Sequence, residues 1–115
     1  MKRNYIKLIQ NADEVMQKNA EPKFETFITP AFIPLRTTVS LAEFMANDDQ
    51  NESEANLIYR MADLVTDIYG GQFTKDDVLD RLHAPDALVE LREQIQFVTE
   101  GQQSDERKKE LAKMV

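Results

Sequence analysis

Carboxylates are the most numerous side chains in this chain that could do chemistry. The stretch "TKDDVLD" (74–80) brings Asp76, Asp77 and Asp80 close together, and such a group could bind Ca²⁺. It has neither the alternating Asp order nor the distant Glu of an EF-hand loop. The three carboxylates are better interpreted as the solvated face of a helix. The sequence therefore predicts no metal site.

His83 is the only histidine and could act as a general base towards a serine. The candidate nucleophiles are Ser40, Ser53 and Ser104, but none stands in the glycine-flanked context of a nucleophile elbow. His83 is expected instead at the end of a short helix, where the helix dipole favours a cation. No spacing singles out two carboxylates for acid–base work. The sequence predicts no catalytic residues, and we do not expect an enzyme.

The stretch "YGGQFTKDD" (69–77) contains two adjacent glycines, as phosphate-binding loops do. Its spacing matches neither the P-loop nor the dinucleotide-binding fingerprint, so no nucleotide cofactor is expected. A structural interpretation is sufficient: Gly70 and Gly71 end one helix in the left-handed conformation. Thr74 then caps the next helix, with Asp77 as an approximate capping-box partner.

Length and composition limit the remaining classes of function. The chain has 115 residues, 42% of them hydrophobic and 30% charged, which suits one globular domain. The absence of Cys excludes a disulfide scaffold, a thiolate metal site and a Cys nucleophile. No stretch has the apolar core of a signal peptide or the roughly 18 apolar residues of a membrane span. We expect a cytoplasmic protein with no membrane partner.

The net charge of −7 is concentrated in the middle of the chain. Between Glu43 and Glu90 there are twelve acidic residues and three basic ones. Such a surface repels phosphate backbones, so no nucleic-acid partner is expected. The charge serves either solubility or the recognition of a basic partner, as in a small acidic inhibitor or a nucleic-acid mimic.

Apolar spacing predicts a mainly α fold: a small helical domain of about four to five helices, with a short extended or β segment near residues 23–35. A further short helix follows the Thr74 cap, and Asn51 with Glu54 has the spacing of a capping pair. Two apolar stripes are expected in the first half of the chain: Tyr5, Leu8, Ile9, Ala12, Val15 and Met16, and then Leu41, Phe44 and Met45. The helix that carries the second stripe is expected to begin near Thr37 or Thr38. Two further stripes are Leu57, Met61, Leu64, Val65 and Ile68, and Leu88, Leu91, Ile95 and Val98.

Three prolines exclude a helix through residues 19–38. Alternation predicts a strand at 23–29, and an extended segment follows at 31–35. Four large apolar side chains in this region are candidate partner-binding residues, which either contact a partner or fill the core. They are Phe27, Phe32, Ile33 and Leu35.

Two units are expected along the chain. Residues 1–100 are predicted to form the single helical domain. Residues 101–115 begin with a run free of large apolar side chains and are predicted to be a mobile, charged C-terminal tail with helical tendency.

Three stretches resemble the tail assembly chaperones of long-tailed, siphovirus-type bacteriophages of Gram-positive hosts. They are "FITPAFIPLR" (27–36), "MADLVTDIYGGQFTKDDVLDRL" (61–82) and "REQIQFVTEG" (92–101), and the Tyr69-Gly70-x-Gln72-Phe73-Thr74 segment is the most characteristic part.

The resemblance implies a factor in the host cytoplasm that is absent from the virion. It implies binding to the tape measure protein, which is kept soluble until the tail tube polymerises around it. The tail tube protein and further copies of the same chain are the other implied partners, the latter in a homo-oligomer. No cofactor is implied.

Overall fold

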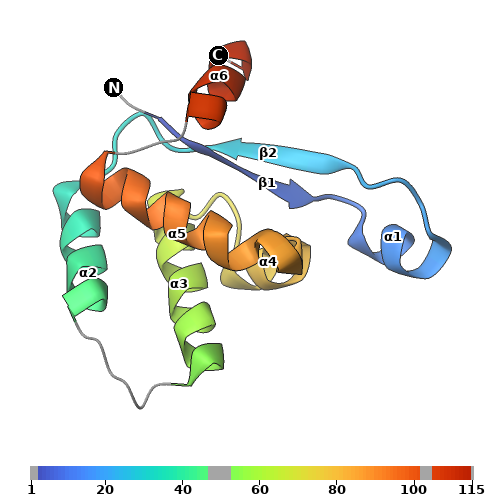
Figure 1. Ribbon diagram of the computed structural model, residues 1–115, viewed down its shortest axis with the longest axis horizontal. Coiled ribbons are helices and arrows are strands. Elements are labelled where there is room, and N and C mark those ends of the chain that lie inside the picture. The colour runs from blue at the N-terminus through green and yellow to red at the C-terminus, as the bar shows by residue number, and fades with distance from the viewer. Residues whose placement is uncertain (1–2, 47–52, 102–104, 115) are drawn as a thin grey trace.

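The computed structural model describes residues 3–46, 53–101 and 105–114. Its elements are, in chain order, β1 (Tyr5–Ile9), α1 (Ala12–Lys18), β2 (Phe24–Ile28), α2 (Leu35–Ala46), α3 (Glu54–Ile68), α4 (Lys75–Arg81), α5 (Ala84–Glu100) and α6 (Asp105–Met114) (Figure 1). The predicted mainly α fold is confirmed, with six helices and a two-stranded sheet among the described residues.

The N-terminal segment corrects one prediction. Its first half is strand β1 rather than a helix, and it pairs antiparallel with β2, with Tyr5 opposite Ile28 and Ile9 opposite Phe24. Ile6 and Leu8 are completely buried on one face of this hairpin. Pairing with a strand far along the chain outweighs the helical spacing, because β-branched and aromatic side chains pack well on a half-buried sheet. The strand predicted at 23–29 is confirmed as β2.

The two strands are connected by an arm, defined as residues 10–23, which contains α1. No residue of α1 is buried. Asn11 closes the arm: its side-chain amide donates to the Glu21 carbonyl at 3.0 Å and accepts from the Lys23 backbone N–H at 2.8 Å. The arm projects from the end of the hairpin that is remote from both termini (Figure 1). It is a folded but peripheral extension of the domain.

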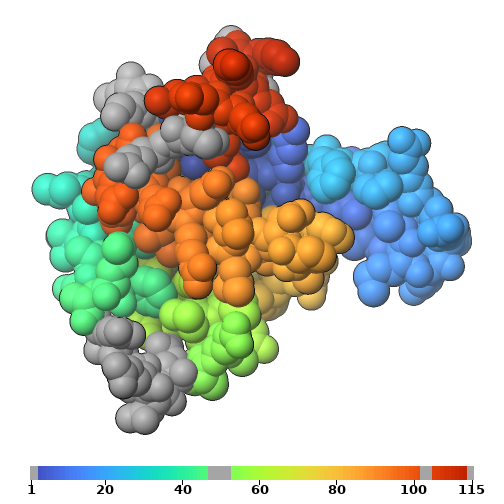
Figure 2. All heavy atoms as spheres, viewed as in Figure 1, coloured from blue at the N-terminus to red at the C-terminus, as the bar shows by residue number. Residues whose placement is uncertain are grey.

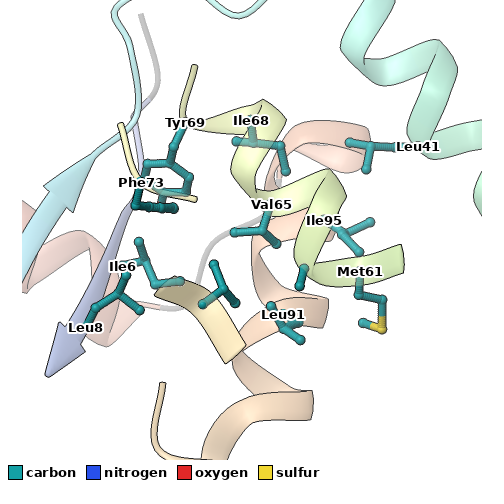
Figure 3. Close-up of a cluster of buried hydrophobic side chains, with 12 residues drawn as sticks. Ile6, Leu8, Leu41, Met61, Val65, Ile68, Tyr69, Phe73, Leu91 and Ile95 are labelled. Carbon is teal, nitrogen blue, oxygen red and sulfur yellow. The ribbon is translucent and has the colours of Figure 1, made fainter. Parts of the chain in front are cut away.

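The core forms around α3, as the strength of its apolar stripe predicts. Met61, Val65 and Ile68 are buried there and pack with side chains from β1, α2 and α5 (Figure 3). Gly70 and Gly71 follow α3 with φ values of +65° and +76°, which confirms the predicted glycine stop. Ser53 caps the start of α3 by accepting from the Asn56 N–H. The expected cap at Asn51 lies outside the described residues.

The predicted capping box is confirmed at the start of α4. The Asp77 N–H donates to the Thr74 hydroxyl at 3.1 Å, and the Thr74 N–H donates to the Asp77 carboxylate at 2.9 Å. Helix α2 begins at Leu35, earlier than the predicted start at Thr37 or Thr38. Pro34 precedes it, and its carbonyl accepts from the Thr37 N–H, so the first turn forms directly after the proline.

Candidate functional site

The structure separates the four predicted partner-binding residues into two pairs. Phe27 and Ile33 are half-buried and pack against the core. The Phe27 ring meets the Phe73 ring edge-on, with 5.0 Å between the ring centroids. Phe32 and Leu35 point outwards, with 67% and 77% of their surface exposed. The structure separates the four by burial, and Phe32 and Leu35 are the more exposed pair.

Histidine and serine side chains do not assemble a catalytic group in the described part of the chain. His83 is the N-cap residue of α5 and is exposed. The Ser40 hydroxyl donates to the Arg36 carbonyl, and the Ser53 hydroxyl accepts from the Asn56 N–H. Ser104 lies outside the described residues. Residues 3–46, 53–101 and 105–114 contain no group of three or more acidic or histidine side chains able to hold a metal ion.

A buried polar cluster joins β1, α3, α5 and α6. At its centre is Gln94, whose side chain is fully buried. Its carbonyl oxygen accepts from the Tyr69 hydroxyl at 2.6 Å and from the Asn4 amide at 3.2 Å. Its amide nitrogen donates to the Tyr5 carbonyl at 2.8 Å and to Glu90 at 2.9 Å. All four hydrogen-bonding positions of this amide are filled, as burial requires.

Arg107 brings α6 into the same cluster. Its guanidinium donates to Glu90 at 3.0 Å, to Glu93 at 3.2 Å and to the Asn4 side chain at 3.0 Å. It also donates to the Tyr5 carbonyl. Only 8% of Arg107 is exposed. The helical tendency predicted for the C-terminal segment is therefore visible as α6, and this helix contacts the domain through charged and polar groups.

The ionisation states in the cluster are fixed by burial and by neighbouring charges. Burial raises the pKa of the Tyr69 hydroxyl, against the opposing effect of Arg107. Burial also raises the pKa of Tyr5 to about 12, and its hydrogen bond to Glu110 adds to the shift. Burial alone would lower the pKa of Arg107, but Glu90 more than compensates and raises it. The tyrosines stay neutral and Arg107 stays charged near neutral pH, so the cluster is suited to holding α6 in place.

An apolar groove lies between the arm and the corner where α4 meets α5. We call it the arm groove; its volume is about 470 Å³. Figure 2 shows the arm, in blue, projecting beyond the yellow and orange atoms of α4 and α5. The groove is lined from the arm side by Ile9, Ala12, Val15, Met16, Pro22 and Phe24, and from the corner by Asp80, Arg81, Leu82, His83 and Ala84.

Arg81 holds the two sides of the arm groove together. Its side chain donates to the Ile9 carbonyl at 2.8 Å and to the Glu25 carboxylate at 2.9 Å. A second carboxylate, Asp77, lies 3.6 Å from the guanidinium. The hydrogen bond from the Thr74 N–H holds the pKa of Asp77 below its usual range, which keeps this carboxylate charged. The charge of Arg81 is therefore matched within the protein.

Spacing along the sequence could not reveal the arm groove, because its walls come from residues 9–24 and 80–84. The sequence places Met16 in a helical stripe and His83 at the end of a short helix, with nothing to connect the two. A smaller hollow of about 260 Å³ adjoins the groove along β1 and shares Phe24, Leu82 and His83 with it. The hairpin and the helix corner must both fold before either hollow exists.

The comparison with protein families decides the class of protein. The family model described as phage tail chaperone protein matches residues 1–115, which is the whole chain. This chain is a member of the phage tail chaperone family. Comparison with curated proteins and with solved structures yields no match.

Exposed apolar side chains mark candidate contact surfaces on this phage tail chaperone. Two surfaces qualify. One is the arm groove. The other, which we call the α2 face, consists of Leu35 and Val39 at the start of α2 and Phe32 just before the helix, all at least half exposed. None of the helices described by the structure is long and apolar enough to cross a membrane.

Proposed function

We propose that this phage tail chaperone binds the tape measure protein through exposed apolar side chains and keeps it soluble before the tail tube polymerises. One observation supports this most strongly. The described residues include eight large apolar side chains that are 46% or more exposed. They are Met16, Phe24, Phe32, Leu35, Val39, Met45, Tyr59 and Val89.

Exposed apolar groups and a high net charge suit a solubilising partner. Apolar side chains gain about 25 cal/mol for each Å² that an apolar client covers. The net charge of −7 then remains on the surface of the complex and opposes its aggregation. A client with many binding segments would be coated by many copies of the chaperone, each bound weakly.

The remaining parts of the proposal follow from the resemblance and from family membership. We propose that the protein acts in the host cytoplasm without catalysis or a cofactor, that it self-associates, and that tail tube protein displaces it. It is then absent from the finished virion. A siphovirus-type tail and a Gram-positive host stay predictions of the resemblance.

Co-expression tests the proposal. The tape measure protein of the same phage is expressed alone and together with this chain, and the soluble fraction is measured after centrifugation. We expect the tape measure protein to be insoluble when expressed alone and soluble when expressed together with this chain. An unrelated aggregation-prone helical protein is the control and should stay insoluble. A tape measure protein that remains in the pellet beside well-expressed, folded chaperone would refute the proposal.

A further inference from the structure

We propose that the arm groove binds an amphipathic helix of the client, one whose apolar stripe is flanked by Lys or Arg. This inference rests on the proposed function and assigns a site and a recognition chemistry to it. The apolar character of the occupant follows from the groove walls. Met16 is 82% exposed and Phe24 is 55% exposed, although both line a concave surface. An apolar occupant would cover both at once.

The helical form of the occupant follows from the state of the strand edge beside the groove. A partner that adds a strand to β1 needs its free backbone groups. The Ile9 carbonyl already accepts from Arg81, and the Tyr5 carbonyl accepts from Gln94 and Arg107. Side chains thus occupy the acceptors at both ends of this edge. A helix satisfies its own backbone hydrogen bonds and needs only apolar contacts from the groove.

The basic flanks follow from the charges around the groove. Asp80 lines the arm groove and Asp86 lines the adjoining hollow. Both are exposed, and among the described residues neither has an ion-pair partner. The Lys and Arg side chains that line the groove and the hollow are matched: Arg81 by Glu25, Lys7 by Glu110, and Arg107 by Glu90.

The same charges disfavour the arm helix of a second copy of this chain as the occupant. Each copy carries a net charge of −7, and α1, the exposed helix of the arm, has Asp13 and Glu14 in its first turn. Bringing such a helix against Asp80 and Asp86 would place like charges together in a partly desolvated groove. A client segment rich in Lys or Arg would instead form opposite-charge pairs at the rim.

The test uses the full chain and two synthetic peptides that share one apolar helical stripe. One peptide carries Lys on both flanks of the stripe and the other carries Glu. Binding is followed by fluorescence anisotropy, with the induced helix content measured by circular dichroism. We expect the Lys peptide to bind and become helical, and the Glu peptide to bind at least about tenfold more weakly. Equal binding of the two peptides, or no binding of either, would overturn the inference.

Two double variants locate the site. Met16→Ser with Phe24→Ser removes the exposed apolar walls of the arm groove. Leu35→Ser with Val39→Ser is the matched control on the α2 face, where the side chains are similarly exposed. We expect the groove variant to weaken binding of the Lys peptide about tenfold or more, and the control to leave it unchanged. Thermal unfolding of both variants establishes that they are folded. The reverse pattern would place the site on α2 and contradict the inference.

Co-expression with the tape measure protein separates failure of this inference from failure of the proposed function. If the unaltered chaperone solubilises the client and the groove variant does so equally well, the groove assignment is wrong and the function stands. If the unaltered chaperone does not solubilise the client, the proposed function itself is wrong. If only the groove variant loses solubilising activity, both are supported.

Discussion

Arg107 of α6 and Glu90 of α5 form an ion pair with 3.0 Å between guanidinium nitrogen and carboxylate oxygen, and both side chains are largely shielded from solvent. Glu93 lies 3.2 Å from the same guanidinium nitrogen. The segment that looks like a charged tail in the sequence is thereby connected to the polar cluster around Gln94. Removing one partner of such a pair leaves the other charge without compensation, which is costly in a buried site.

Arg107→Ala should therefore lower the free energy of unfolding by about 3 kcal/mol and release α6 from the domain. Denaturant unfolding measures the first effect, and amide hydrogen exchange of residues 105–114 measures the second. Lys108→Ala is the matched control on the exposed side of the same helix and should change stability by less than about 0.5 kcal/mol. Unchanged exchange in α6 after Arg107→Ala would contradict the role given to this residue.

Alkaline pH should destabilise the protein through Tyr5. Its pKa is about 12 in the folded protein against an ordinary value of 10.0, so the folded state holds the proton more tightly. The associated stability is present below pH 10 and is lost as the pH rises from 10 to 12, because there the unfolded state binds fewer protons. Tyr69 shifts in the same direction. In Tyr5→Phe, the midpoint of denaturant unfolding should decrease less steeply between pH 10 and 12. An unchanged dependence of the midpoint on pH would refute the role of Tyr5.

Acidic pH should also destabilise the protein, in this case through Glu110. Hydrogen bonds from Lys7 and Tyr5 hold its pKa below the ordinary value of 4.5. The contribution of this carboxylate is present above pH 4.5 and is lost as the pH falls through the lowered pKa. Glu110→Gln should make the stability of α6 less sensitive to acid. Amide hydrogen exchange of α6 at mildly acidic pH measures this effect. Glu106→Gln, in the first turn of the same helix and exposed, is the control.

The division of the predicted partner-binding residues is also testable. Phe27→Ala removes a ring that packs on Phe73 and should lower the free energy of unfolding by roughly 2 kcal/mol or more. Phe32→Ala removes an exposed ring and should change it by no more than about 0.5 kcal/mol. Equal losses in the two variants, measured by chemical denaturation, would mean that Phe32 belongs to the core.

The unmatched carboxylates of the groove predict a salt-dependent interaction. Asp80→Asn with Asp86→Asn should weaken binding of the Lys-flanked peptide and reduce the dependence of its affinity on ionic strength. Asp67→Asn with Glu43→Gln, two exposed carboxylates on α3 and α2 away from the groove, is the matched control and should preserve both. Anisotropy titrations at low and high salt measure the difference. If the control variant weakens binding as much as the groove variant does, the effect comes from the net charge of the protein and not from the groove carboxylates.

The features that could be predicted from the sequence are those that depend on neighbouring residues. The stripe from Leu57 to Ile68, the glycine stop and the Thr74–Asp77 capping box each involve short-range contacts, and all are present. Strand β1 could not be predicted in this way. The spacing of Tyr5, Leu8 and Ile9 suits a helix, and only pairing with β2 shows that Ile6 and Leu8 share the buried face.

The contacts of α6 and the arm groove depend on long-range geometry. Arg107 reaches groups on β1 and α5, and no periodic pattern in a charged segment indicates that one arginine is buried. The groove combines Met16 and Phe24 with the α4–α5 corner, so it appears only in the folded chain. The sequence nevertheless indicated candidate partner-binding residues beside a high negative charge, and two of them, Phe32 and Leu35, are exposed.

The mass of the purified complex shows whether several copies of this chain bind the tape measure protein and keep it soluble. The chaperone is co-expressed with the tape measure protein of the same phage, and the co-purified material is analysed by size exclusion with light scattering. We expect one soluble species that contains both proteins, with several copies of this chain for each client. Two separate species, or a chaperone that elutes as a monomer while the tape measure protein aggregates, would contradict it.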